Sequence, residues 1–528
     1  MKLFLLFVIC FFQVYKIQTC CASLGTSDSV KDKKLLDFYT AAVVEYAADE
    51  GTENLNPEQI LWKNVENYGR IMAQAAEEEN VDIIVFPENG LTSALFSSLK
   101  KNITFAPLLQ KIPEVGVNPC RRDELLIVVQ SEVIQHLSCS AKANRMYLVV
   151  NLGETVSTSN NEISEGETRD LRYNTAVVFD RDGTIVAKYR KYNLFAEPQF
   201  DAPEIPELST FTTDFGVTFG VFICFDLLFE QPAKQLVANE ITHFVFPTSW
   251  IDELPFLTAI QAQMFWASSS KATLLASGYH NPEFGKMGSG IYLPSGQPLN
   301  YTFNPDSGTQ VVYAKVPKIP ERATTKSTIV NTNVHKNMES LFAMHFYYRE
   351  NLGNYTGVTL PMTPGENKIS ACDNEFCCEV QYTYIDSHSV GTSLPEEMKT
   401  ATHKLIVFNQ QRKFSSPSVV RLMGLQICSV VRCLNDTMES CAEYSTKPDH
   451  DLLPGFEAIQ LSASPFKVFQ HSQPGFTTLD TTLEVIPLEL FEQKLEEERR
   501  DYSVKSNSIK EFQIQTIALF NRVFSSEE

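Results

Sequence analysis

Three side chains that could together hydrolyse an amide each stand at the end of an apolar segment. Cys224 ends the run GVFIC, Glu88 follows VDIIVF, and Lys191 ends TIVAKYRK. The thiolate is the attacking form of cysteine, and a neighbouring carboxylate can take the thiol proton and later activate water. A lysine ammonium can stabilise the oxyanion that forms when sulfur attacks a carbonyl. These residue types therefore predict amide hydrolysis through a thioester.

Each of the three residues also has an ordinary structural explanation. A lone cysteine can be a small buried hydrophobe, Glu88 can be a surface carboxylate in a turn, and Lys191 can form a salt bridge at a sheet edge. Alternation along a strand, however, puts Lys191 on the same face as Ala187 and Tyr189. Because a buried ammonium without a partner is costly, we expect Lys191 to have an acidic neighbour.

The cysteine count favours a free thiol at position 224. The chain has 12 cysteines, and loss of Cys10, Cys20 and Cys21 with a leader would leave nine, an odd number. Cys120 and Cys139 stand in one region and could pair with each other. Six more cysteines form a later cluster with 15 conceivable connectivities, which stay open at this point: Cys372, Cys377, Cys378, Cys428, Cys433 and Cys441.

Alternating strand and helix patterns surround the three chemical residues. Apolar runs predict strands at 38–47, 81–88, 146–154, 216–229 and 241–250, and a hairpin at 174–195 that turns at Asp182-Gly183. Helical spacing of apolar residues predicts helices at 57–79 and 258–272. This order predicts an α/β domain with helices covering a sheet, where ligands bind at the carboxyl ends of strands.

The texture of the chain changes after the α/β region. We place a catalytic domain at residues 36–325 and a smaller, β-rich, disulfide-braced domain at 335–515, with the junction in 324–337. Short strands separated by turns are predicted at 379–385, 403–409 and 418–433. The charged run EQKLEEERRD at 492–501 is expected to form the solvated face of a helix.

The N-terminus and the sequons predict export from the cell. Residues 1–22 combine Lys2, a ten-residue apolar run and small residues near Ala22, the order of a signal peptide, and the run is too short to span a bilayer. No other stretch has transmembrane length. We therefore expect a soluble, secreted, extracellular protein without a membrane anchor. Four sequons are candidate glycosylation sites: Asn102, Asn300, Asn354 and Asn435.

Composition excludes several other classes of protein. There are 44 Lys and Arg residues and 64 Asp and Glu residues, so the formal net charge of −20 offers no basic footprint for nucleic acid. The chain contains no Gly-x-Ser-x-Gly elbow, His-Glu-x-x-His motif or Walker loop. We expect no metal and no cofactor. Oligomeric state cannot be predicted from these patterns.

The segments around the three residues resemble a known family. VFPEN at Glu88, KYNLF at Lys191 and ICFDLLFEQPA at Cys224 look like the three catalytic segments of the nitrilase superfamily. FPTSW at 246–250, GSGIY at 288–292 and the Cys-x4-Cys-Cys cluster at 372–378 are similar to the vanin and biotinidase branch. The resemblance implies an αββα-sandwich catalytic domain followed by a family-specific β domain.

The resemblance also implies roles and a substrate class. Glu88 would be the general base, Lys191 the oxyanion stabiliser and Cys224 the nucleophile, with Glu197 as a supporting carboxylate. Enzymes of this branch hydrolyse a linear, small-molecule amide without metal or cofactor. They release pantothenate and cysteamine from pantetheine, or biotin from biotinyl-lysine. The sequence does not distinguish between these two substrates.

Two other functions remain open on the sequence. One is a Cys-His hydrolase in which His243 or His280 activates Cys224; His243 lies in an apolar strand and is better explained as a core histidine, whereas His280 lies in a loop. The other is a catalytically silent secreted binding protein on the same fold, because a fold does not determine a function.

Overall fold

The computed structural model describes ten segments of the chain. They are residues 37–49, 56–92, 108–121, 131–157, 170–319, 348–385, 402–415, 420–443, 455–467 and 471–524. The predicted signal peptide at 1–22, the sequon at Asn102 and the predicted junction at 324–337 lie outside these segments. Of the helices in the described segments, none combines the length and apolar character that crossing a bilayer requires.

Two six-stranded sheets form the first half of the molecule, with strand orders β13-β1-β2-β3-β4-β5 and β12-β11-β10-β8-β7-β6. The strands of the first sheet are β1 (Phe38–Glu45), β2 (Ile83–Val85), β3 (Tyr147–Val156), β4 (Leu171–Phe179), β5 (Ile185–Arg190) and β13 (Gln310–Pro317). Those of the second are β6 (Thr210–Thr212), β7 (Thr218–Val221), β8 (His243–Thr248), β10 (Thr273–Gly278), β11 (Ser289–Tyr292) and β12 (Pro298–Thr302). β1, β2 and β3 run parallel, as do β7, β8 and β10.

The first sheet separates two apolar layers. Along β1, Ala42 and Val44 pack with helices α3 (Pro57–Glu79) and α5 (Glu132–Asn144), whereas Ala41 and Val43 pack with the second sheet. Successive side chains of a strand point to opposite faces, so one face of β1 contacts helices and the other contacts the second sheet. Helix α3 has the predicted bounds, and Asn56 caps it by accepting a hydrogen bond from the backbone N–H of Gln59.

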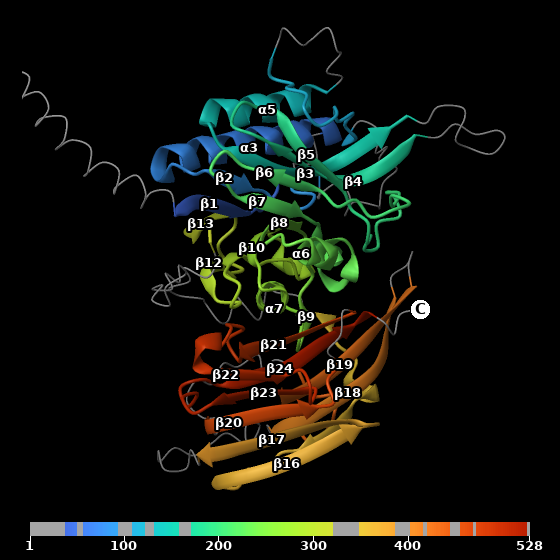
Figure 1. Cartoon of the computed structure of the whole chain (residues 1–528), viewed down its shortest axis with the longest axis vertical. Helices are drawn as coiled ribbons and strands as arrows, with labels where there is room; N and C mark the ends of the chain where they lie inside the picture. The colour runs from blue at the N-terminus through green and yellow to red at the C-terminus, as the bar shows by residue number, and fades with distance from the viewer. Residues whose placement is uncertain are drawn as a thin grey trace, which may run out of the picture.

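Helix α7 (Ala259–Ser270) forms the outer layer on the second sheet. Trp266 packs against Phe222 and Phe244, with ring centroids 4.8 and 4.9 Å apart. The neighbouring Phe265 faces the other way, toward Phe520 of the C-terminal region, at 5.3 Å. Because α7 is covered on both sides, it is buried nearly all round, including Gln261 and Gln263, and it has no distinct polar face. Figure 1 shows α7 between the second sheet and the C-terminal strands. The αββα sandwich expected from the sequence is confirmed.

Two five-stranded antiparallel sheets form the C-terminal region, with orders β15-β18-β19-β24-β21 and β16-β17-β20-β23-β22. The first contains β15 (Thr356–Thr359), β18 (Thr402–Ser415), β19 (Val420–Cys433), β21 (Ser472–Asp480) and β24 (Ile514–Val523). The second contains β16 (Gly365–Asp373), β17 (Phe376–Ile385), β20 (Gly455–Ser464), β22 (Glu492–Glu496) and β23 (Asp501–Ser506). The predicted β-rich region is confirmed, and Figure 1 places it at the end of the molecule opposite α3 and α5.

The prediction of a helix in the charged run at 492–501 is wrong. Residues 492–496 form β22, an edge strand that pairs with β23, and the chain then turns. Helix-favouring Glu, Gln and Lys residues yield here to pairing with a neighbouring strand, since tertiary context overrides propensity. The expected solvent exposure is present, because β22 lies at the edge of its sheet. Its charged side chains discourage pairing of this edge with other molecules.

Four disulfides brace the described regions, and they leave Cys224 as the free cysteine there. The predicted Cys120–Cys139 pair is confirmed. The open connectivity of the later cluster is decided by strand pairing. Cys372–Cys377 closes the β16–β17 turn, Cys378–Cys428 joins the two C-terminal sheets, and Cys433–Cys441 closes the loop after β19.

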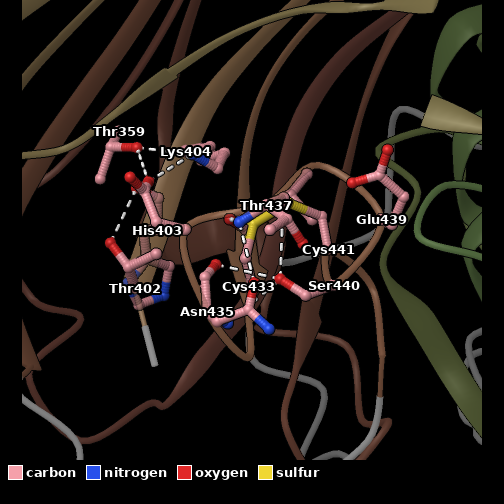
Figure 2. Close-up of a disulfide and its surroundings, with 12 residues drawn as sticks. Thr359, Thr402, His403, Lys404, Cys433, Asn435, Thr437, Glu439, Ser440 and Cys441 are labelled. Atoms are coloured by element: carbon pink, nitrogen blue, oxygen red, sulfur yellow. Dashed lines mark hydrogen bonds and ion pairs between the residues drawn. A yellow bond between two sulfur atoms is a disulfide. The ribbon is translucent and has the colours of Figure 1, made fainter. Parts of the chain in front are cut away.

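Figure 2 shows the loop that Cys433–Cys441 closes. The backbone N–H of Asn435 donates to Ser440 Oγ at 3.1 Å, and the backbone N–H of Thr437 donates to Asn435 Oδ1 at 2.9 Å. The Asn435 side chain is exposed, although its backbone is held in place. The sequon therefore lies on a rigid surface loop.

We predict that Asn435 is glycosylated and that Asn300 is not. Asn300 lies in β12, where its side-chain amide donates to the Tyr313 carbonyl at 3.0 Å, so the nitrogen that would carry a glycan already contacts β13. Enzymatic deglycosylation followed by peptide mass spectrometry should convert Asn435 to Asp and leave Asn300 unchanged, with Asn435→Gln as the control. A glycan on Asn300 with none on Asn435 would contradict this prediction.

A buried arginine fastens the two halves of the molecule together. Arg522 in β24 is fully buried; its Nε donates to the Leu228 carbonyl at 2.8 Å, and its Nη1 donates to the Gly424 carbonyl at 2.6 Å.

Substitution Arg522→Met should lower the free energy of unfolding by about 2–4 kcal/mol, because two buried carbonyls lose charged donors. Arg421→Met, at an exposed position of β19, is the matched control. Equal denaturation curves for the two variants would show that this contact contributes nothing to stability.

Candidate active site

Glu88 lies just beyond β2, at the carboxyl end of a strand buried on both faces. Its Oε1 accepts hydrogen bonds from Lys191 Nζ at 2.6 Å and from Asn174 Nδ2 at 2.8 Å. Its Oε2 accepts from the backbone N–H of Ser249 at 3.0 Å. The surface-turn explanation of Glu88 is therefore wrong, because only 2% of the residue is exposed and three donors converge on it.

Lys191 is the first residue after β5 and is only 1% exposed. Ala187 and Tyr189 are buried on the same face, so the alternation inferred from the sequence is confirmed. The ammonium donates to Glu88 at 2.6 Å and to Glu197 Oε2 at 2.7 Å. The expected acidic neighbour is thus a pair of carboxylates. Two carboxylates from separate loops balance the cost of burying this cation.

Cys224 occupies a sharp turn between a strand and a short helix. The predicted strand at 216–229 is shorter than expected: β7 ends at Val221, and Cys224–Leu228 form a 3-10 helix. Cys224 has φ of 47°, in the left-handed region that a residue with a Cβ seldom adopts. The chain needs this conformation to leave the sheet abruptly.

Asp226 stabilises the turn at Cys224. Its Oδ2 accepts from the backbone N–H of Ile223 at 3.0 Å and from the Tyr189 hydroxyl at 2.7 Å, while Oδ1 accepts twice from Asn193, at 2.9 and 2.8 Å. Tyr189 and Asn193 flank Lys191 by two residues on either side. Asp226 therefore connects the cysteine turn to the lysine segment. The sequence analysis did not assign this role, because it depends on residues more than 30 positions away along the chain.

Asn174 in β4 connects the two carboxylates. Its Nδ2 donates to Glu88 Oε1 at 2.8 Å and to Glu197 Oε1 at 2.7 Å, and its Oδ1 accepts from Asn151 at 2.6 Å. The sequence analysis missed this residue too. The available signal was a pair of asparagines within otherwise apolar strands, because a buried polar side chain in such a strand needs partners.

The electrostatics of the site separate the two carboxylates. Burial alone would raise the pKa of Glu88, but the Lys191 charge and the hydrogen bonds from Lys191, Cys224 and Asn174 together lower it below its usual value. For Glu197, burial raises the pKa and Lys191 does not offset this effect. Two carboxyls that share one cation thus differ in their tendency to hold a proton, as is typical of acid–base sites.

The Cys224 thiol lies within hydrogen-bonding reach of the Glu88 carboxylate and near Thr248 and the backbone N–H of Ser249. Burial is the largest influence on its pKa and raises it; the negative charge of Glu88 raises it further, and the Lys191 ammonium opposes them. The resting sulfur is therefore a protonated thiol that faces an ionised carboxylate. Such a pair suits attack with simultaneous proton transfer rather than attack by a standing thiolate.

Neither candidate histidine is a partner of Cys224. His243 begins β8, at the end opposite Thr248; burial lowers its pKa to about 4, and its Nε2 shares a hydrogen bond with the Pro317 carbonyl at 3.2 Å. The Nδ1 of His280 shares a hydrogen bond with the Glu45 carboxylate at 2.8 Å. The groups around Cys224 come from Glu88, Lys191, Thr248 and Ser249 instead. Within the ten described segments, no group of three or more His, Cys, Asp or Glu side chains is arranged to hold a metal ion.

Comparison with known proteins matches both halves of the chain to family models. Residues 41–273 match the carbon-nitrogen hydrolase family, and residues 344–527 match the vanin C-terminal domain. Vanin-like protein 1 of Drosophila melanogaster is 33% identical over 420 residues, which cover 77% of this chain and 70% of that protein. Biotinidase of Takifugu rubripes is 32% identical and covers 73% and 76%; human pantetheinase is 30% identical and covers 77% and 76%.

The fold and the family match define the chain as a carbon–nitrogen hydrolase, an enzyme that acts on amide bonds other than peptide bonds. Within that class it belongs to the vanin family, the branch of the nitrilase superfamily that carries the vanin C-terminal domain. The resemblance inferred from the short motifs is thereby confirmed. The protein is an amidohydrolase of this family.

We predict that Cys224 shows no thiolate absorbance at the pH where an ordinary cysteine ionises, about 8.5. The wild-type minus Cys224→Ala ultraviolet difference should develop only at more alkaline pH, since both burial and Glu88 raise this pKa. Glu88→Gln removes the negative charge and should move the onset to lower pH. A thiolate signal already present at neutral pH, or an onset that Glu88→Gln leaves in place, would contradict this electrostatic account.

Proposed function

We propose that the protein hydrolyses pantetheine to pantothenate and cysteamine, with Cys224 as the nucleophile, Glu88 as the general base and Lys191 as the oxyanion stabiliser. The observation that carries the proposal is the buried Lys191 ammonium, bonded to Glu88 and Glu197 beside the free thiol of Cys224. Glu197 supports the site by accepting a second hydrogen bond from the same ammonium.

The first half of the reaction forms a thioester. As the sulfur of Cys224 attacks the amide carbonyl, its proton passes to Glu88. The carbonyl oxygen becomes an oxyanion, and the Lys191 ammonium stabilises it in a site from which water is largely excluded. The carbon–nitrogen bond then breaks, and the departing amine takes the proton from Glu88. The lowered pKa of Glu88 supports this role, because the carboxylate is ionised and ready to accept.

The second half of the reaction regenerates the thiol. Glu88, again ionised, removes a proton from a water molecule that attacks the thioester carbonyl. Collapse of the resulting oxyanion breaks the carbon–sulfur bond, releases a carboxylic acid, and returns the proton to sulfur. Both oxyanions form on the same carbonyl, so Lys191 stabilises both from one position.

Hydrolysis of biotinyl amides is the second candidate function. A biotinidase from Takifugu rubripes is as similar to this chain as the pantetheinase relatives are, at 32% identity. The residues around the reacting groups do not distinguish the two acyl groups, because the proposed chemistry is the same for any linear amide.

We further propose a domain organisation and a location for the enzyme. Residues 1–22 are the signal peptide, residues 36–325 the catalytic domain, and residues 335–515 the C-terminal domain of a secreted extracellular protein. Four disulfides in the described regions support this location, because disulfides persist in oxidising compartments.

Turnover assays test the proposed function. Purified protein should release cysteamine from pantetheine faster than biotin from biotinyl-lysine. Cys224→Ala and Glu88→Gln should each reduce kcat by at least about 1000-fold, because they remove the nucleophile or the group that takes its proton. His280→Ala should keep more activity than Glu88→Gln. Mass spectrometry should detect an acyl group on Cys224. Equal turnover by wild type and Cys224→Ala, or preferred cleavage of biotinyl-lysine, would contradict the corresponding part of the proposal.

A further inference from the structure

Cys224 opens into a cavity of about 680 Å³ whose walls come from both halves of the molecule. Phe195, Phe225 and Glu253 line it from the first half, and Glu350, Arg412 and Phe414 line it from the second. β9 (Glu253–Leu254) pairs in parallel with β14 (Tyr348–Arg349) at this boundary, so backbone pairing joins the two sides of the cavity. A substrate carbonyl on the sulfur would therefore place part of the substrate against C-terminal residues.

An aromatic wall adjoins the sulfur. Phe225 follows Cys224 directly, and its ring centroid lies 5.0 Å from that of Phe195 and 5.1 Å from that of Phe414. Phe195 and Phe414 are themselves 5.2 Å apart, so the three rings form one cluster. Phe414 belongs to β18 and is only half-buried, because one side of its ring faces the cavity. This wall suits an apolar portion of a substrate chain.

A guanidinium lies farther along the same strand. Arg412 precedes Phe414 by two residues, so both side chains leave β18 on one face, roughly 7 Å apart. Arg412 Nη1 pairs with Glu350 at 2.6 Å, and its Nη2 pairs with Glu253. A guanidinium has five N–H donors. The two carboxylates hold its plane in place and leave further donors for a ligand in the cavity.

Resting on the proposed function, we propose that Arg412 and Phe414 of the C-terminal region are specificity-determining residues of the hydrolase. The enzyme selects amides whose acyl chain is apolar beside the scissile carbonyl and carries a hydrogen-bond acceptor beyond it. Phe414 packs on the apolar part, and Arg412 donates to the acceptor. The vanin C-terminal domain thereby completes the substrate site rather than serving only as a support.

Three aminocoumarin amides test this assignment. One has an acetyl group, which has no chain to pack along the aromatic wall. The second has an acyl chain that spans the roughly 7 Å between Phe414 and Arg412 and ends in a primary amide, and the third has an alkyl chain of equal length. Wild type should show a higher kcat/KM for the amide-tipped chain than for the alkyl chain. Arg412→Lys should reduce that ratio about tenfold, because lysine lacks the planar guanidinium that can bond Glu350, Glu253 and a ligand at the same time.

Phe414→Leu should raise KM for both long-chain amides about fivefold and raise it less for the acetyl amide, because a long chain packs more apolar area on the ring. Phe456→Leu, at a buried position in the same domain outside the cavity, and Arg421→Lys, at an exposed position of β19, are matched controls that should leave all three rates unchanged. If Phe414→Leu does not fold, Phe414→Tyr keeps the ring, places a hydroxyl on the apolar wall, and should weaken the alkyl amide selectively.

The outcomes separate this inference from the proposed function. An unchanged amide-to-alkyl ratio in Arg412→Lys, or equal losses on short and long chains in Phe414→Leu, would overturn the inference while catalysis by Cys224 stands. Hydrolysis of the acetyl amide by Cys224→Ala at the wild-type rate would overturn the proposed function itself. A tenfold loss of selectivity with acetyl turnover intact supports both.

Discussion

The Lys191 ammonium between two carboxylates is the interaction on which the site depends. A cation that is 1% exposed is tolerated only where anions and their own partners surround it. Glu88 and Glu197 provide the charge, and Asn174 holds both carboxylates in place. Loss of any partner would leave a buried polar or charged group without one of its hydrogen bonds. Because the buried Lys191 ammonium needs both carboxylates as partners, the end of β2, the end of β5 and the loop after β5 must lie close together.

A further buried carboxylate, that of Asp226, connects the Lys191 segment to the turn that holds the sulfur of Cys224. Asp226 accepts four hydrogen bonds, three from Tyr189 and Asn193 in the segment that carries Lys191 and one from the backbone N–H of Ile223 beside the sulfur. Burial raises its pKa to about 6, which is the cost of using a carboxylate as an internal anchor. The bond from the backbone N–H of Ile223 to Asp226 spans Cys224 and supports the left-handed conformation of that residue.

Much of the first half of the molecule could be predicted from the sequence, because burial on both faces produces long apolar runs that flanking turn residues interrupt. Helix α3 has the predicted bounds, and the alternation that turned Lys191 inward needed only the period of a strand. An odd number of cysteines must leave one unpaired. Cys224 was the one left after Cys120 was assigned to Cys139 and the other six to the later cluster. The edge strand β22 was missed because its residues favour a helix when no neighbouring strand is considered.

The sequence by itself determined the residue types of the site, the strands after which those residues lie and the family to which the chain belongs. Only the tertiary structure decided which groups meet: the disulfide pairs of the later cluster, the roles of Asp226 and Asn174, and the contact of Phe414 with Phe225. The physical reason is distance along the chain. Periodicity reports which face of an element is buried, whereas hydrogen bonds between residues tens to hundreds of positions apart depend on how the sheets are stacked.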